Sequence, residues 1–147
     1  MEATDRFRHL TARDGLASNW VRSIIRDSRG FLWVGTQNGL SRYDGISFRT
    51  YRYAPNDPRA LPFSVAGVLH EDRAGRLWVG SSWADSGIAY YDRAADVFVS
   101  LPHGTGSGGL SGGRVEAIIG AHAAEPSWPV AGPPTRAPAA GTSTSER

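Results

Sequence analysis

The chain has 147 residues, 40% of them hydrophobic, which is enough for one domain with its own core. Its sixteen basic residues are all arginine and are interspersed with fourteen acidic ones, so no basic run indicates a nucleic-acid site. The absence of cysteine excludes disulfides and thiolate chemistry, and no apolar stretch is long enough for a membrane span or a signal peptide.

The first third of the chain predicts four short strands, at residues 21–26, 31–36, 40–43 and 47–53. Turn residues separate them. Asp27 begins a turn that ends at Gly30, Asn38-Gly39 is typical of a tight hairpin, and Asp44 and Gly45 turn the chain again. Neighbouring strands joined by tight turns give an antiparallel meander.

The middle of the chain repeats this pattern, and its strands are expected at residues 65–70, 76–81, 87–91 and 97–101. Trp33 and Trp78 occupy equivalent positions 45 residues apart, a period within the range of four-stranded repeat units. An insertion around Trp83 lengthens the second copy. The repeated positions are Asp27, Gly30, Trp33, Gly35, Gly39, Tyr43 and Asp44, which recur as Asp72, Gly75, Trp78, Gly80, Gly87, Tyr91 and Asp92.

A third copy begins and stops. Residues 109–120 align without a gap with residues 15–26, which predicts the first strand of a third unit at 115–120. The expected Leu-Trp-Val-Gly does not follow. Residues 121–147 are rich in proline and alanine, lack periodicity and are predicted to be disordered, either as a linker or as an out-of-frame reading of a GC-rich gene.

Consecutive apolar residues in the second strand of each unit require cover on both faces of the sheet. Radial stacking of sheets provides this cover, and such rings close with about four to eight units. We therefore predict an all-β fold, a partial β-propeller of two four-stranded antiparallel blades plus the first strand of a third. The predicted segments are a lead-in (1–18), blade 1 (19–53), an inter-blade loop (54–64), blade 2 (65–101), a Gly-rich loop (102–114), the third-blade strand (115–120) and the tail (121–147).

The motif D-x-x-G-F-L-W-V-G-T-x-x-G-L-x-R-Y-D-G at residues 27–45 resembles the two-component regulator propeller repeat. Two further matches flank it: F-x-x-L-x-x-x-D-G-L, beginning at Phe7, and F-x-x-Y at Phe48 and Tyr51. The resemblance implies a bacterial receptor with an extracytoplasmic or periplasmic propeller sensor, followed by a β-sandwich, one membrane helix and a cytoplasmic output such as a histidine kinase. Some such receptors sense oligosaccharides. A kinase region is absent from the sequence, so signalling through a phosphorelay is expected of a longer parent.

The repeated tryptophans and aspartates are best explained structurally, as core between blades and as turn hydrogen bonding. Trp20, Trp83 and Tyr90 do not recur, so they are the candidate ligand-binding residues, since aromatic rings on loops stack on sugar faces. Asn19, Arg22 and Asp85 are the hydrogen-bonding candidates beside them.

Other motifs are given no chemical role. The sequence G-x-G-x-x-G at residues 104–109 leads into a strand and not a helix, which argues against a dinucleotide site. Glu71 and Asp72 are adjacent, so a strand would point them to opposite faces. The histidines have no metal-ligand spacing: His9, His70, His103 and His122. We therefore expect no catalytic residue, no metal and no cofactor.

The sequence thus predicts a non-catalytic sensory segment of a receptor. Its expected partners are the remaining blades of the parent, a small extracellular ligand such as an oligosaccharide, and a second copy in a homodimer of the parent. Two alternatives stay open: a fragment of a propeller-type lyase or hydrolase, and a non-functional truncated gene product.

Overall fold

The computed structural model describes residues 7–83, 87–101 and 114–120, and within them the protein is built from two four-stranded antiparallel sheets. One short 3-10 helix, Ala12–Asp14, precedes the first sheet. The strands of the first sheet, blade 1, are β1 Val21–Arg26, β2 Leu32–Thr36, β3 Gly39–Tyr43 and β4 Phe48–Tyr51. Those of the second, blade 2, are β5 Val68–Glu71, β6 Leu77–Gly80, β7 Ile88–Asp92 and β8 Val97–Ser100. The prediction of two four-stranded meanders is confirmed.

Each sheet follows chain order, so strands that are neighbours within a sheet are also neighbours in the sequence. Gly39 closes the β2–β3 hairpin with a φ of 118°, a left-handed backbone angle that favours glycine. The strand ends differ from the predicted ones by up to three residues. The largest difference is at β5, because the Ala66 N–H donates to the Thr36 carbonyl of blade 1 instead of pairing within its own sheet.

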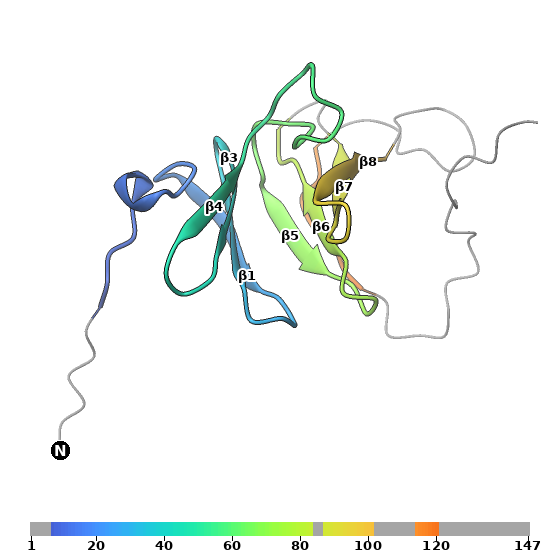
Figure 1. Ribbon diagram of the computed structural model, residues 1–147. Helices are drawn as coiled ribbons and strands as arrows, with labels where there is room; N and C mark the ends of the chain where they lie inside the picture. Colours follow the sequence, from blue (N-terminus) through green and yellow to red (C-terminus); the bar gives the residue numbers. More distant parts are fainter. Residues whose placement is uncertain (1–6, 84–86, 102–113, 121–147) are drawn as a thin grey trace, which may run out of the picture.

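The two sheets stand side by side, and the surfaces that face each other form the core (Figure 1). Alternation along the strands places Trp33 and Leu40 of blade 1 on this side, where both are fully buried. Blade 2 contributes Leu77, Val79 and Tyr91, which are also buried. Trp33 lies 5.2 Å from Tyr91 between ring centroids, in an edge-to-face arrangement. The inter-blade core predicted from the sequence is therefore present.

The segment before each blade packs in an equivalent way. Leu16 precedes β1 and Leu61 precedes β5 at the corresponding position of the repeat, and both are buried. The Ala17 N–H donates to the Ser41 hydroxyl at 2.8 Å, which holds the lead-in against blade 1. The lead-in is thus a part of the blade that it precedes.

Residues 114–120 lie on the outer face of blade 2, where the third blade would begin, but they form no strand ladder. The Val115 N–H donates to the Ser81 carbonyl at 2.7 Å, which repeats the bond from Ala66 to Thr36 at the preceding interface. The Leu-Trp-Val-Gly strand with which this segment would pair is missing from the sequence, so its edge has no ladder partner. Residues 114–120 therefore lie where a third blade would begin, but they do not pair as its first strand.

The Gly-rich loop predicted at 102–114 falls outside the described residues except for Arg114, and the tail predicted at 121–147 lies wholly outside them. Among the residues that the structure describes, no helix has the length and apolar character needed to cross a membrane.

Candidate functional site

The β1–β2 turn of blade 1 is organised around the Asp27 carboxylate. Its Oδ1 accepts hydrogen bonds from the backbone N–H groups of Arg29 and Phe31 at 3.0 and 2.9 Å. Its Oδ2 accepts from the Trp33 indole Nε1 at 2.8 Å. One buried carboxylate therefore shapes the turn and orients the tryptophan that fills the inter-blade core.

Blade 2 repeats this arrangement. Asp72 Oδ1 accepts from the N–H groups of Ala74 and Arg76 at 2.9 and 3.0 Å, and Oδ2 accepts from Trp78 Nε1 at 2.8 Å. Whereas Trp33 is fully buried, Trp78 is half-buried on the outer face of blade 2. The two tryptophans thus share backbone position and the indole hydrogen bond, and they differ in the cover that a neighbouring blade provides.

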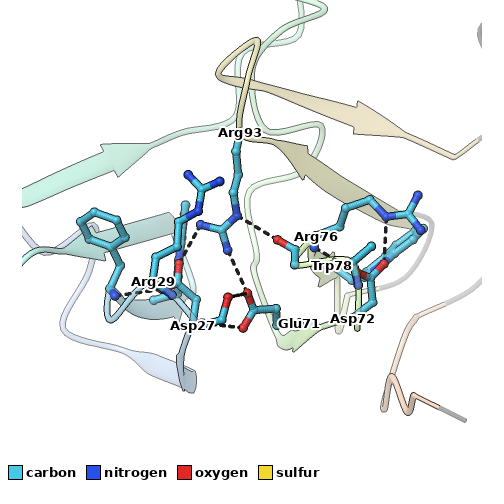
Figure 2. A network of polar contacts seen from close by, with 12 residues as sticks. Asp27, Arg29, Glu71, Asp72, Arg76, Trp78 and Arg93 are labelled. Atoms are coloured by element: carbon cyan, nitrogen blue, oxygen red, sulfur yellow. Dashed lines mark hydrogen bonds and ion pairs between the residues drawn. The ribbon is translucent and has the colours of Figure 1, made fainter. Parts of the chain in front are cut away.

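An ion-pair network joins the two blades at these turns (Figure 2). Arg93, in the β7–β8 turn, reaches between Asp27 and Glu71, with Nη1 2.8 Å from Asp27 Oδ2 and Nη2 3.3 Å from Glu71 Oε1. Its Nε donates to the Gly75 carbonyl at 2.9 Å. Glu71 in turn accepts from the backbone N–H and the hydroxyl of Ser28, both at 2.7 Å. Every charge in this seam has an opposite charge beside it, so the seam is a structural clamp.

The hydrogen bonds of the turns affect the acidity of both aspartates. Burial of Asp27 opposes its ionisation, but the Trp33 indole, Arg93 and the Phe31 N–H outweigh it and hold the pKa of Asp27 below its ordinary value. Burial likewise opposes ionisation of Asp72, and its bonds from Trp78 and Arg76 lower its pKa. Both aspartates are therefore anions at neutral pH and are unsuited to act as general acids.

A second seam joins β4 of blade 1 to β7 and the β7–β8 turn of blade 2. The hydroxyl of Tyr91 donates to Asp96 and lies 3.2 Å from the Tyr51 hydroxyl, while Arg49 forms an ion pair with the same aspartate. Next to these residues is an open hollow of about 310 Å³, also lined by arginines and an aspartate of the inter-blade segment: Arg52, Arg59 and Asp57. Arg52 and Arg59 donate to backbone carbonyls, so their side chains brace this rim.

Two of the three candidate ligand-binding residues lie at one common end of the sheets. Trp20 enters β1 and Trp83 follows β6, and meander topology puts both positions at the end that holds the β2–β3 turn. The bond from Ala66 to the Thr36 carbonyl and that from Gly67 to the Gly80 carbonyl bring these ends of the two blades together. Both indoles project into solvent, with 71% and 57% of their surface exposed.

The third candidate, Tyr90, lies elsewhere. It is in the middle of β7, 5.4 Å from the Trp78 ring, on the face of blade 2 that points away from blade 1. Asn19 uses its side-chain oxygen to accept the Ala12 N–H at 2.7 Å, and Arg22 is exposed on β1. Asp85, His103 and His122 lie outside the described residues.

Among the described residues, no three histidine, aspartate or glutamate side chains come together in a way that could hold a metal ion. Glu71 is the last residue of β5 and accepts hydrogen bonds in the inter-blade seam, whereas Asp72 follows the strand and accepts hydrogen bonds within its own turn. Sequence reasoning missed the role of Arg93 and Glu71, because neither residue recurs at its equivalent position in blade 1, which holds Gly45 and Arg26.

Comparison with known proteins identifies the repeat. The family model described as two component regulator propeller matches residues 15–38. A curated protein from Formosa agariphila, "Histidine kinase P4", is 42% identical over 55 residues, which are 37% of this chain and 4% of that protein. A solved structure, the extracellular domain of a putative hybrid two component system from B. thetaiotaomicron, has a TM-score of 0.59 and 25% identity. The alignment covers 69% of this chain and 14% of the chain in that structure.

The chain thus spans only a small part of these relatives. The matched segment contains β1, the Asp27 turn and β2 with Trp33, which have counterparts in blade 2. Blade 1 therefore carries the two-component regulator propeller repeat over residues 15–38, and the two blades are similar in fold to part of the extracellular domain of a hybrid two-component system.

Proposed function

We propose that the chain is a non-catalytic sensory segment of an extracytoplasmic β-propeller in a bacterial two-component receptor. In this proposal the longer parent binds a small extracellular ligand, such as an oligosaccharide, and passes the signal to a kinase. The repeat, the likeness to an extracellular domain and the likeness to a histidine kinase support this assignment. This chain matches only 4% of the histidine kinase and 14% of the solved extracellular domain, so kinase activity is proposed for the longer parent alone.

The observation that carries the ligand proposal is the exposure of Trp20 and Trp83 at one end of adjoining sheets. Large aromatic surfaces in water are unfavourable unless something covers them, and indole faces stack well on the apolar faces of sugar rings. Their backbones are held by local bonds: Trp20 N–H donates to Ser18 Oγ at 3.2 Å, and Trp83 N–H donates to Ser81 Oγ at 3.3 Å. The aspartates of the turns, in contrast, are already occupied, which argues against hydrolase chemistry.

The test uses the parent receptor with Trp20→Ala, Trp83→Ala and the double substitution, titrated with a panel of neutral and acidic oligosaccharides. We expect the double variant to lose about tenfold or more in affinity for the sugar that binds, as stacking residues at binding hot spots commonly do. Ile46→Ala is the matched control, because Ile46 is also exposed but lies in the β3–β4 turn at the opposite end of blade 1. Equal affinity in the parent and the double variant would remove Trp20 and Trp83 from the ligand site.

A further inference from the structure

The outer flank of blade 2 differs chemically from the equivalent flank of blade 1, and the difference lies in which arginine reaches the turn aspartate. In blade 1, Asp27 Oδ2 accepts from its own tryptophan and from Arg93, which comes from the next blade, at 2.8 Å. In blade 2, Asp72 Oδ2 accepts from Trp78 and from Arg76 Nε at 2.9 Å, within the same blade. The equivalent oxygen of each aspartate thus accepts a hydrogen bond from a guanidinium, which comes from the next blade at Asp27 and from the same blade at Asp72 (Figure 2).

The source of the guanidinium depends on one exchanged pair of residues. Arg76 occupies the repeat position of Phe31, and Tyr90 occupies that of Arg42. Arg42 is the cross-strand partner of Trp33, and Tyr90 is the cross-strand partner of Trp78. Arg42 stacks over Phe31 at 4.7 Å, and Arg76 lies over Tyr90 at 5.9 Å, so each blade keeps one cation–aromatic pair with its members swapped. The swap in blade 2 brings the cation next to the turn aspartate.

From this geometry we propose that the outer flank of blade 2 is suited to an adjoining blade with a small neutral residue at the position equivalent to Arg93. This position lies in the turn between the third and fourth strands of a blade. Blade 1 shows such a turn, since its Tyr-Asp sequence is followed by Gly45. The inference concerns how blades are matched, and it is independent of the proposed ligand.

Two observations indicate that an arginine at that position in the adjoining blade would add no stability. Arg76 already provides a positive charge at Asp72 Oδ2, so a second guanidinium would meet a like charge at an oxygen that has two donors. Arg93 also relies on the Glu71 carboxylate of its own blade, and the residue of the third copy equivalent to Glu71 is Gly120. An arginine there would have no counterpart of Glu71 and would have to share Asp72 with Arg76.

The direct test completes the third blade from the chain's own repeat. A copy of residues 72–101 replaces residues 121–147. In this copy, the arginine that corresponds to Arg93 is either kept or changed to glycine. We expect the two extended proteins to differ by less than about twofold in folding equilibrium constant, whereas Arg93→Gly in blade 2 should lower it about tenfold or more, as loss of one partner of a buried ion pair does. When Arg76→Phe is introduced into both extended proteins, the one that keeps the copy's counterpart of Arg93 should become the more stable. A tenfold advantage of that arginine while Arg76 is present would overturn the proposal.

The unextended chain provides a second test that does not depend on folding of an added blade. Phe31→Arg with Arg42→Tyr transfers the blade 2 pair into blade 1, so that Asp27 receives a guanidinium from its own blade. The loss caused by Arg93→Gly should then shrink from about tenfold or more to less than about threefold, and the backbone effect of glycine cancels between the two backgrounds. An undiminished loss would show that Arg76 does not substitute for an inter-blade arginine.

Discussion

The Cα of Gly35 faces the carbonyl of Ala66 so closely that a Cβ on Gly35 would lie 2.5 Å from that oxygen. The two residues belong to different blades, so the inter-blade packing leaves no room for a side chain at Gly35. In blade 2 the equivalent glycine is Gly80, and a Cβ on it would lie 2.7 Å from Val115 Cγ1. The glycine of each Leu-Trp-Val-Gly strand is thus a contact point for the blade that follows.

Gly35→Ala is therefore expected to separate the blades, because a backbone oxygen and the Ser23 hydroxyl cannot both move away from the added methyl group. We expect a loss of about 1–3 kcal/mol in the free energy of unfolding, the usual range for overpacking. Gly80→Ala is the matched control, since the added methyl group would meet side chains, those of Val115 and Ile118, and no backbone atom, so it should cost less. Urea denaturation of both variants measures the difference; equal losses would contradict the proposed backbone approach.

Asp27→Asn tests the clamp between the blades. The amide cannot accept all the hydrogen bonds of the carboxylate, and it leaves Arg93 without its closest anion, so the unfolding free energy should fall by about 3 kcal/mol or more. Asp72→Asn should cost less, because its ion pair with Arg76 is more exposed and lies within one blade. Chemical denaturation of the two variants compares the losses, and a larger loss at Asp72 would argue against an inter-blade role for Asp27.

Stability should fall in acid because of the same two carboxylates. Their pKa values are lowered in the folded state from an ordinary value of 3.8, so their contribution is present above that pH and is lost as the pH falls through the lowered folded values. We expect the unfolding free energy of the native chain to decline over this acid range. Asp27→Asn should show a shallower decline, and an identical slope in both proteins would exclude Asp27 as a cause.

The two repeated tryptophans should respond differently to truncation. Trp33→Ala removes a fully buried indole from the inter-blade core and should cost about 3–5 kcal/mol. Trp78→Ala removes one that is half-buried on the outer flank, so its cost should be clearly smaller. Equal costs by denaturation would mean that a further layer covers Trp78.

Tyr91 should ionise only at unusually high pH. Burial raises the pKa of its hydroxyl above the ordinary value of 10.0, and the hydrogen bond to Asp96 raises it further, because an anion beside a carboxylate is disfavoured. Ultraviolet absorbance during an alkaline titration of the folded protein should therefore contain a tyrosine signal that appears only above the ordinary range and moves to lower pH after unfolding. Tyr91→Phe should abolish this difference; if it persists, another tyrosine is the shielded one.

The amino-acid sequence by itself determined the strands, the turns and the pairing of blades, because these depend on local chemistry that occurs twice. Asp27 and Gly30 shape one turn, Asn38 and Gly39 shape the next, and the recurrence of Trp33 as Trp78 gives the register between blades. Residues that occur once carry no such signal.

Only the tertiary structure decided what joins the blades and where the candidate ligand residues lie. Arg93 and Glu71 meet Asp27 and Ser28 across a seam between residues far apart in the chain, and no local pattern marks such a contact. Packing of the sheets likewise placed Tyr90 on a flank, away from the common strand ends. The physical reason is that turns and strands arise from neighbours in sequence, whereas the charge pairing of a seam depends on which surfaces the folded sheets bring together.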